Sequence, residues 1–148
     1  MADVSDPIIR ETYDEVRDDR SEVSWLILQY ENERSDKLIL HAKGSGGLAQ
    51  LADNLSEDQA AFAYCRVNVS NDELSVRTKF VFITWIGSRV KVMRKAKLSV
   101  HVSDVKRILQ AYAIEITAYE KFDFNESEVL TKLRRAGGAN YDRGSHNY

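Results

Sequence analysis

Two short runs of the chain are apolar at every position, and they limit the folds that the chain can adopt. Trp25–Leu28 consists of Trp, Leu, Ile and Leu, and Phe80–Ile83 consists of Phe, Val, Phe and Ile. Because successive side chains of a strand point to opposite faces, a strand of this kind buries both faces and needs cover on both sides. The chain therefore needs a sheet that lies between two layers of other elements.

Further runs of strand length accompany these two. Ala60–Val67 is the longest, Phe80–Ile86 extends the second apolar run, and weaker candidates lie at Lys37–His41 and Ala113–Thr117. These runs predict a central mixed sheet of five or six strands.

Four stretches repeat apolar residues with helical spacing and can supply the covering layers. Pro7 suits the first turn of a helix, and Asp6 suits its N-cap. The four apolar stripes are Ile9, Tyr13 and Val16; Leu48, Leu51, Ala52 and Leu55; Val105, Ile108, Leu109 and Tyr112; and Val129, Leu130, Leu133 and Ala136. The element order α-β-β-α-β-β-α-β-α predicts an α/β (α+β) fold with helices on both faces of the sheet.

A chain of 148 residues is long enough for one domain of ordinary size. We expect the domain to cover residues 1–141 and residues 142–148 to form a flexible tail, because the segment from Gly137 onward is small and polar. The acidic N-terminal stretch lacks the apolar core of a signal peptide, and no apolar run reaches the roughly 20 residues that span a bilayer. We expect a cytoplasmic monomer.

Charge is unevenly distributed along the chain. Residues 1–75 hold 7 basic and 16 acidic side chains, whereas residues 76–148 hold 14 basic and 7 acidic ones. The stretch 76–107 holds nine basic residues against the single acid Asp104. Such a stretch either steers an acidic partner or forms a solvated basic face.

No group of residues predicts catalysis. The loop Lys43–Gly47 lacks the spacing of a phosphate-binding Walker motif and is interpreted as a connector between a strand and a helix. His41, His101 and His146 are isolated and have no zinc-ligand spacing, and Cys65 falls in a predicted core strand. We therefore expect no catalytic residue, no cofactor and no metal site.

Five segments, in this order along the chain, resemble the coactosin family. They are Tyr13–Asp19, Ser75–Phe80, Thr84–Gly87, Arg94–Lys97 and Ala136–Asp142. The opening Met1–Ser5 and the Gly44–Gly47 loop resemble amoebal members in particular. The resemblance implies the actin-depolymerising-factor homology (ADF-H) fold, a single domain in which helices cover both faces of a mixed sheet.

The resemblance also implies a function, which is binding to the side of actin filaments and protection from capping proteins without severing. The family's main filament-binding lysine, at the end of a polar hairpin, matches Lys79; Arg77 matches a basic residue before it, and Val76 stands where a lysine is common. The remaining implied contacts are Arg94, Lys95 and Lys97 after Trp85, and Lys132, Arg134 and Arg135 in the last helix. No enzymatic activity is implied.

Three alternatives stay open from the sequence. The first keeps the fold but binds actin monomers and promotes turnover, as cofilin does. The second is a scaffold for a lipoxygenase, because related animal proteins use a basic residue at the position of Arg135. The third is non-specific nucleic-acid binding by the stretch 76–107, which the slightly acidic total charge disfavours and which salt dependence of binding would test.

Overall fold

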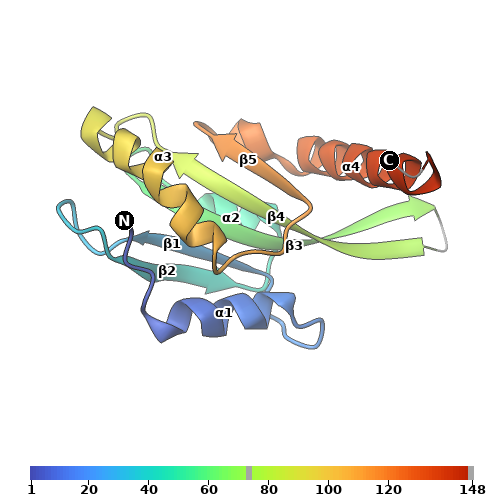
Figure 1. Cartoon of the computed structure of the whole chain (residues 1–148), viewed down its shortest axis with the longest axis horizontal. Coiled ribbons are helices and arrows are strands. Elements are labelled where there is room, and N and C mark those ends of the chain that lie inside the picture. The colour runs from blue at the N-terminus through green and yellow to red at the C-terminus, as the bar shows by residue number, and fades with distance from the viewer. Residues whose placement is uncertain (73–74, 147–148) are drawn as a thin grey trace.

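A mixed β-sheet forms the centre of the molecule, with helices on both of its faces (Figure 1). The computed structural model describes residues 1–72 and 75–146, with side chains over 1–70 and 76–136, and within these ranges the sheet has five strands. They are β1 (Trp25–Tyr30), β2 (Leu38–Gly44), β3 (Ala60–Asp72), β4 (Ser75–Ile86) and β5 (Ile114–Ala118). Their order is β2-β1-β3-β4-β5; β4 and β5 are parallel and the other neighbours are antiparallel. The predicted fold class is confirmed.

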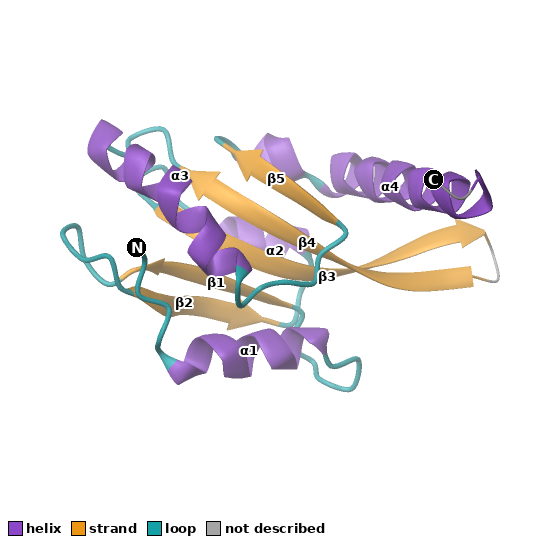
Figure 2. Cartoon of the chain, in the orientation of Figure 1, coloured by secondary structure: helices purple, strands orange, loops and turns teal. Residues whose placement is uncertain are grey.

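The helices divide between the two faces of the sheet, as Figure 2 shows. They are α1 (Pro7–Arg17), α2 (Leu48–Asp53), α3 (Val92–Lys106), the short 3-10 helix η1 (Lys121–Phe124) and α4 (Glu126–His146). Helices α1 and α3 pack on one face, and α2, η1 and α4 pack on the other. The predicted element order is confirmed, and η1 is an addition to it.

Alternation along the strands explains why two separate cores form. In β4, Val81, Ile83 and Trp85 point toward α2 and α4, whereas Phe80 and Phe82 point toward α1 and α3. Both sets are largely or fully buried, since helices cover both faces. The runs that are apolar at every position therefore form the strands that are covered on both sides, as predicted.

The start of α1 illustrates how local sequence sets an element. The Asp6 carboxylate accepts a hydrogen bond from the Ile8 N–H at 3.1 Å, and Pro7 occupies the first helical position. Ile9 and Val16 are then completely buried. Burying an aliphatic side chain of this size contributes about 1.5–3 kcal/mol, so the apolar stripe holds α1 on the sheet.

One helix prediction is wrong in its position. The stripe from Val105 to Tyr112 predicted a helix there, but α3 lies earlier in the chain and ends at Lys106. Leu109 still donates its N–H to the Val105 carbonyl at 2.9 Å and packs in the same core as α3. The apolar spacing therefore covers the last turn of α3 and the residues that follow it, and tertiary packing buries both.

The C-terminal boundary stays a prediction. Backbone of α4 continues through Gly137 to His146. The predicted tail, 142–148, begins inside this helix, and its last two residues lie outside the described part of the chain. Deletion of residues 142–148 would test whether they form a flexible tail.

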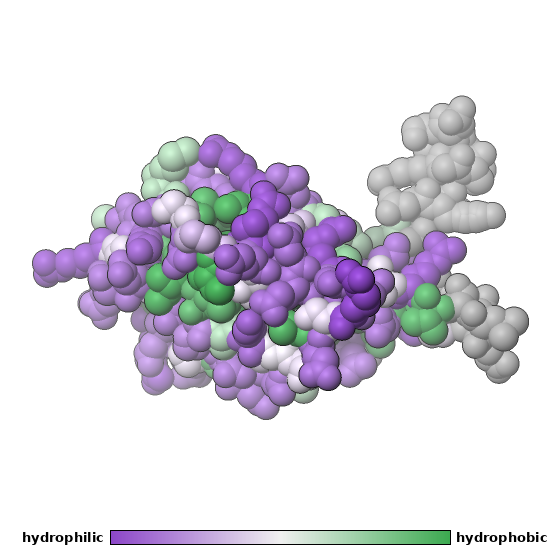
Figure 3. Space-filling view, turned by 90° about the horizontal axis from the view of Figure 1, so that it is seen from below, coloured by the Kyte–Doolittle hydropathy of each residue, from purple (hydrophilic) through white to green (hydrophobic). Residues whose placement is uncertain are grey.

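Hydrophilic side chains cover most of the face that Figure 3 shows, and smaller apolar patches lie among them. Within the described residues, no helix combines the length and the apolar character needed to cross a membrane.

Candidate functional site

The β3–β4 hairpin extends beyond the rest of the sheet. Strand β1 pairs with β3 only over Ala61–Cys65, and β5 pairs with β4 only from Val81 onward. Past these points the two strands continue as a two-stranded ribbon, which projects to the right in Figure 1. The hairpin is described up to Asp72 and again from Ser75, since residues 73–74 lie outside the described chain.

Arg77 and Lys79 lie on this ribbon, on the face that carries α4. They pair with Val69 and Val67, and they have the same strand parity as Val81. Val69 is only 3% exposed, and it belongs to the same core cluster as the α4 residues Val129 and Leu133. Arg77 is exposed and Lys79 is half-buried beside this packed base.

Helix α4 brings three further cations to the same face. Lys132, Arg134 and Arg135 are all exposed, whereas Val129 and Leu133 turn inward. Since successive helical residues are about 100° apart, Lys132 and Arg135 share one flank of α4 and Arg134 lies toward the other. The three residues therefore cannot all contact one flat surface equally.

The cations of the hairpin and α4 share one property. Their side chains make no hydrogen bond, ion pair or ring contact with another described residue; they are Arg77, Lys79, Lys132, Arg134 and Arg135. We call these five residues the hairpin–α4 cluster. Their charge is available to a partner.

The other three predicted residues lie far from this cluster. Arg94, Lys95 and Lys97 are on the first turns of α3, which begins after the opposite end of β4 (Figure 1). Gly87 sets this entry to α3, because a side chain there would collide with the carbonyl of Glu57. The structure therefore splits the eight predicted residues into two groups at opposite ends of the sheet.

Two of the α3 cations already have partners. The Arg94 guanidinium lies 3.8 Å from the centre of the Tyr30 ring and donates hydrogen bonds to the carbonyl oxygens of Asn32, at 3.2 Å, and Glu33. Lys97 forms a 3.0 Å ion pair with Asp36, and this hydrogen bond lowers the pKa of the Asp36 carboxyl. Lys95 is exposed and has no such partner among the described residues.

Polar residues that sequence reasoning missed hold α3 from beneath. The Tyr30 hydroxyl and His101 Nδ1 are 2.8 Å apart, and the buried Asp104 carboxylate accepts the Ala2 N–H at 2.9 Å. Burial raises the pKa of Tyr30 to about 12 and lowers the pKa of His101. The available signal was spacing, because His101 falls one turn after Leu98 and one turn before Val105.

The outer side of α3 carries exposed apolar residues, which the sequence analysis also missed. Val92, Met93 and Val100 are 78%, 75% and 66% exposed. Exposed apolar side chains gathered on one element are a common mark of a protein-contact surface.

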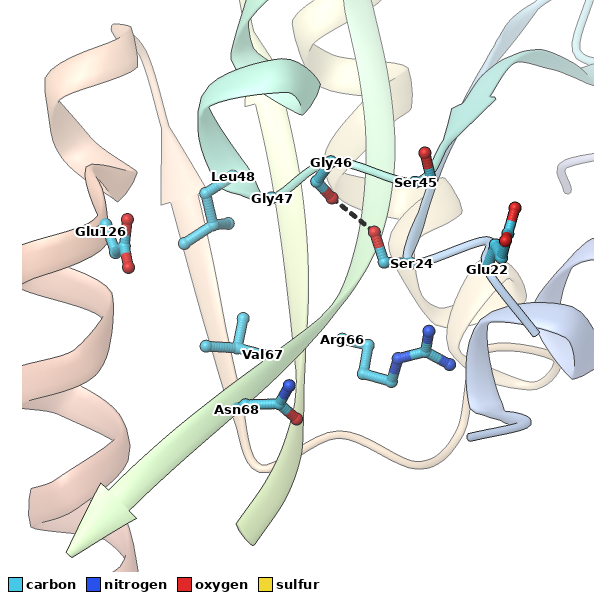
Figure 4. Close-up of a pocket in the computed structure, with 10 residues that line it drawn as sticks. All are labelled: Glu22, Ser24, Ser45, Gly46, Gly47, Leu48, Arg66, Val67, Asn68 and Glu126. Carbon is cyan, nitrogen blue, oxygen red and sulfur yellow. Dashed lines mark hydrogen bonds between the residues drawn. The ribbon is translucent and has the colours of Figure 1, made fainter. Parts of the chain in front are cut away.

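The Gly-rich loop borders a shallow cavity of about 380 Å³, shown in Figure 4. The Ser24 hydroxyl donates to the Gly46 carbonyl, and the Gly46 N–H donates to Gln50 Oε1 at 2.8 Å. Arg66 donates to the carbonyl oxygens of Val16, Asp18 and Ser21. Because these polar groups are already used within the chain, the loop acts as the predicted connector into α2.

Cys65 is completely buried in the core, as predicted. Burial raises the pKa of its thiol to about 12, so the thiol stays protonated at neutral pH. Across the described residues, no three His, Cys, Asp or Glu side chains gather as a metal-ligand set.

Comparison with known proteins shows the family of the chain. Residues 1–134 match the family described as cofilin/tropomyosin-type actin-binding protein. Coactosin from Dictyostelium discoideum is 41% identical over 142 residues, which cover 95% of each chain. The crystal structure of coactosin from Entamoeba histolytica superimposes with a TM-score of 0.83 at 32% identity, covering 93% of this chain and 97% of that one. The solution structure of mouse coactosin, described as an actin filament binding protein, has a TM-score of 0.75 at 30% identity, covering 97% of this chain and 98% of that one. The chain belongs to the coactosins, within the cofilin family of actin-binding proteins.

Proposed function

We propose that this protein binds the side of actin filaments through the hairpin–α4 cluster, and that it protects filaments from capping rather than severing them. The observation that carries the proposal is that the five cations of the hairpin–α4 cluster, on the side of the sheet that carries α4, have no side-chain partner among the described residues. The name of the mouse relative, an actin filament binding protein, supports the same partner.

Energetics require several of these cations to act together. An exposed ion pair contributes only about 0.2–1 kcal/mol, so one contact cannot hold the protein on a filament. Basic residues at the rim of an interface with an acidic polymer mainly raise the association rate and set the orientation. Binding that repeats along a filament lattice makes a modest affinity per site sufficient.

Such a protein acts by binding and needs neither catalysis nor a cofactor. We place it as a monomer on the actin cytoskeleton of the cytoplasm. Capping protection is tested by filament elongation in the presence of capping protein, where added protein should preserve growth without increasing the number of filament ends.

Co-sedimentation with filaments tests the binding surface. Lys79→Ala should pellet less than wild type, while Lys37→Ala, a change at a second half-buried lysine in the acidic half of the chain, should pellet normally. Binding should weaken between low and physiological salt, where the Debye length falls to about 8 Å. Equal pelleting of all three proteins at both salt concentrations would reject this surface.

Binding of actin monomers through α3 is the second candidate function. The exposed Val92, Met93 and Val100 favour it, and Lys95 on the same helix has no side-chain partner among the described residues. A native-gel shift with monomeric actin measures this activity separately from pelleting. Met93→Ser should reduce the shift and leave pelleting unchanged; an unchanged shift would exclude α3 as the monomer contact.

A further inference from the structure

The loop between β1 and β2 (residues 31–37, the β1–β2 loop) provides partners for two of the basic side chains of α3. Its Asp36 carboxylate pairs with Lys97, and the carbonyl groups of Asn32 and Glu33 accept from Arg94. Arg94, Lys97 and Lys95 are the three residues of α3 for which the family resemblance implied contact with actin. With the loop in place, Lys95 alone of the three stays unpartnered among the described residues.

We propose that the β1–β2 loop is a specificity determinant: Asp36 neutralises Lys97 and so weakens the contact of α3 with actin monomers. The partner rests on the proposed function, and the role of the loop does not depend on the hairpin–α4 cluster. Binding is thereby biased toward the filament, because the cluster at the other end keeps its charge.

Lys97 lies beside the exposed apolar residues of α3, where its charge would affect the binding of a partner. Lys97 follows Met93 by four residues and precedes Val100 by three, so all three lie on neighbouring positions of the helix surface. Met93 and Val100 are the exposed apolar residues of this side. An ammonium group released from Asp36 would therefore lie at the edge of an apolar contact surface, where a cation can pair with an acidic partner.

Asp36 can lose its charge without loss of the loop. Its backbone carbonyl accepts the Asp3 N–H at 2.9 Å, and the Leu38 N–H donates to the Asp3 carbonyl at 2.9 Å. The side chains of Asp36 and Lys97 are 40% and 44% exposed, so their pair lies at the surface. Arg94 holds the loop independently of Asp36, through its hydrogen bonds to the carbonyl oxygens of Asn32 and Glu33.

The chain offers a closely matched control for this pair. Lys43 and Glu15 are also 3.0 Å apart, and their side chains are 41% and 38% exposed. Glu15→Gln frees one lysine and changes net charge by the same single unit as Asp36→Asn, but away from α3. Any general effect of charge will therefore act on both variants.

The test is binding of monomeric actin by the full chain in low and in physiological salt. Asp36→Asn should bind more tightly than wild type at low salt, by up to about fivefold, which is the upper limit for one exposed charge pair. Glu15→Gln should match wild type, the double variant Asp36→Asn/Lys97→Gln should return to wild type, and physiological salt should remove most of the gain. Thermal unfolding of each variant checks that the fold is kept.

Several results would overturn the role of the loop. One is that Asp36→Asn binds monomers no better than wild type, which includes the case in which neither binds. Another is an equal gain for Glu15→Gln, and a third is a gain that persists in the double variant. Wild-type pelleting with filaments is measured in parallel: its absence would reject the proposed filament contact, while the monomer comparison would still decide on Asp36.

Discussion

The two ends of the β3–β4 pair carry similar numbers of basic residues, and these residues differ in what they contact. At the hairpin end, the side chains of Arg77 and Lys79 make no hydrogen bond, ion pair or ring contact with another described residue. At the other end, Arg94 and Lys97 are held by the carbonyl groups of one loop and by Asp36. A cation with an internal partner stabilises the protein, and one without a partner is available for binding.

The basic residues of one stretch can therefore contribute to two different properties, stability of the fold and binding of a partner. A hydrogen bond to a charged group contributes about 1.5–3 kcal/mol to a fold, whereas an unpaired exposed cation contributes almost nothing to it. Mutations at the two ends should therefore change different observables. The hairpin–α4 cluster should affect binding, and the Arg94 site should affect stability.

Charge reversal at Lys79 should give the largest effect. Lys79→Glu should weaken filament binding by more than about tenfold, because like charges brought together cost several kcal/mol and about 1.4 kcal/mol is tenfold in affinity. Co-sedimentation measures this change. Lys95→Glu, the same reversal at the other end, should cost much less, and an equal loss would show that both ends contact the filament.

Loss of Arg94 should give the next largest effect, on stability. Arg94→Ala removes the stacking on Tyr30 and two hydrogen bonds that are exposed to solvent. Because water screens these bonds and can replace them, the free energy of unfolding should fall by only about 1–2 kcal/mol. Denaturant titration measures it, and filament binding should stay at the wild-type level. Arg134→Ala is the control and should leave stability within about 0.5 kcal/mol; if Arg94→Ala behaves the same way, Arg94 is not structural.

A smaller effect should appear when the pH is lowered from 7.5 to 5.5, through His101 in α3. The folded-state pKa of His101 lies below its ordinary value of 6.5, because burial disfavours the charged ring. As the pH falls, the unfolded chain therefore takes up the proton first. The stability that neutral His101 contributes is fully present above about pH 6.5 and is lost as the pH falls through the folded-state pKa. Asp36 and Asp104 oppose this lowering of the pKa, whereas the N-terminal ammonium and Lys97 add to it.

Denaturant titrations at pH 7.5 and pH 5.5 measure this loss. His101→Gln should reduce the difference between the two pH values, and His41→Gln, at an exposed histidine, should not. The same pH dependence in both variants would assign the effect to other groups.

Removal of the tail should give the smallest effect. Deleting 142–148 should change the melting temperature by no more than a few degrees, because this segment is polar and has no apolar stripe. A larger drop would show that this segment packs on the rest of the domain.

Much of the fold follows from local sequence. Asp6 and Pro7 mark the start of α1, and the fully apolar run at Phe80–Ile83 requires cover on both faces, which α1, α3, α2 and α4 provide. These predictions succeeded because capping and alternation depend on neighbouring residues. The stripe from Val105 to Tyr112 misled, because buried residues after the end of α3 continue the helical spacing by tertiary packing.

The candidate site was harder to predict. Charge alone marked the stretch 76–107, and the resemblance singled out all eight basic residues. Charge does not distinguish Lys79 from Lys97. The distinction lies in partners far along the chain: Asp36 is 61 residues from Lys97, and Tyr30 lies 64 positions before Arg94. Only folding brings them together.

The regular pairing of β3 with β4 limits how the chain can change in length. Between Lys79 and Trp85, every residue pairs in uninterrupted register, so one inserted or deleted residue there would move Arg77 and Lys79 to the face of α1 and α3. A change in length near the turn, where the register already shifts between Ser70 and Asp72, would leave both on the face of α4. Related chains should therefore differ in length at the turn, while the strand between Lys79 and Trp85 keeps its length.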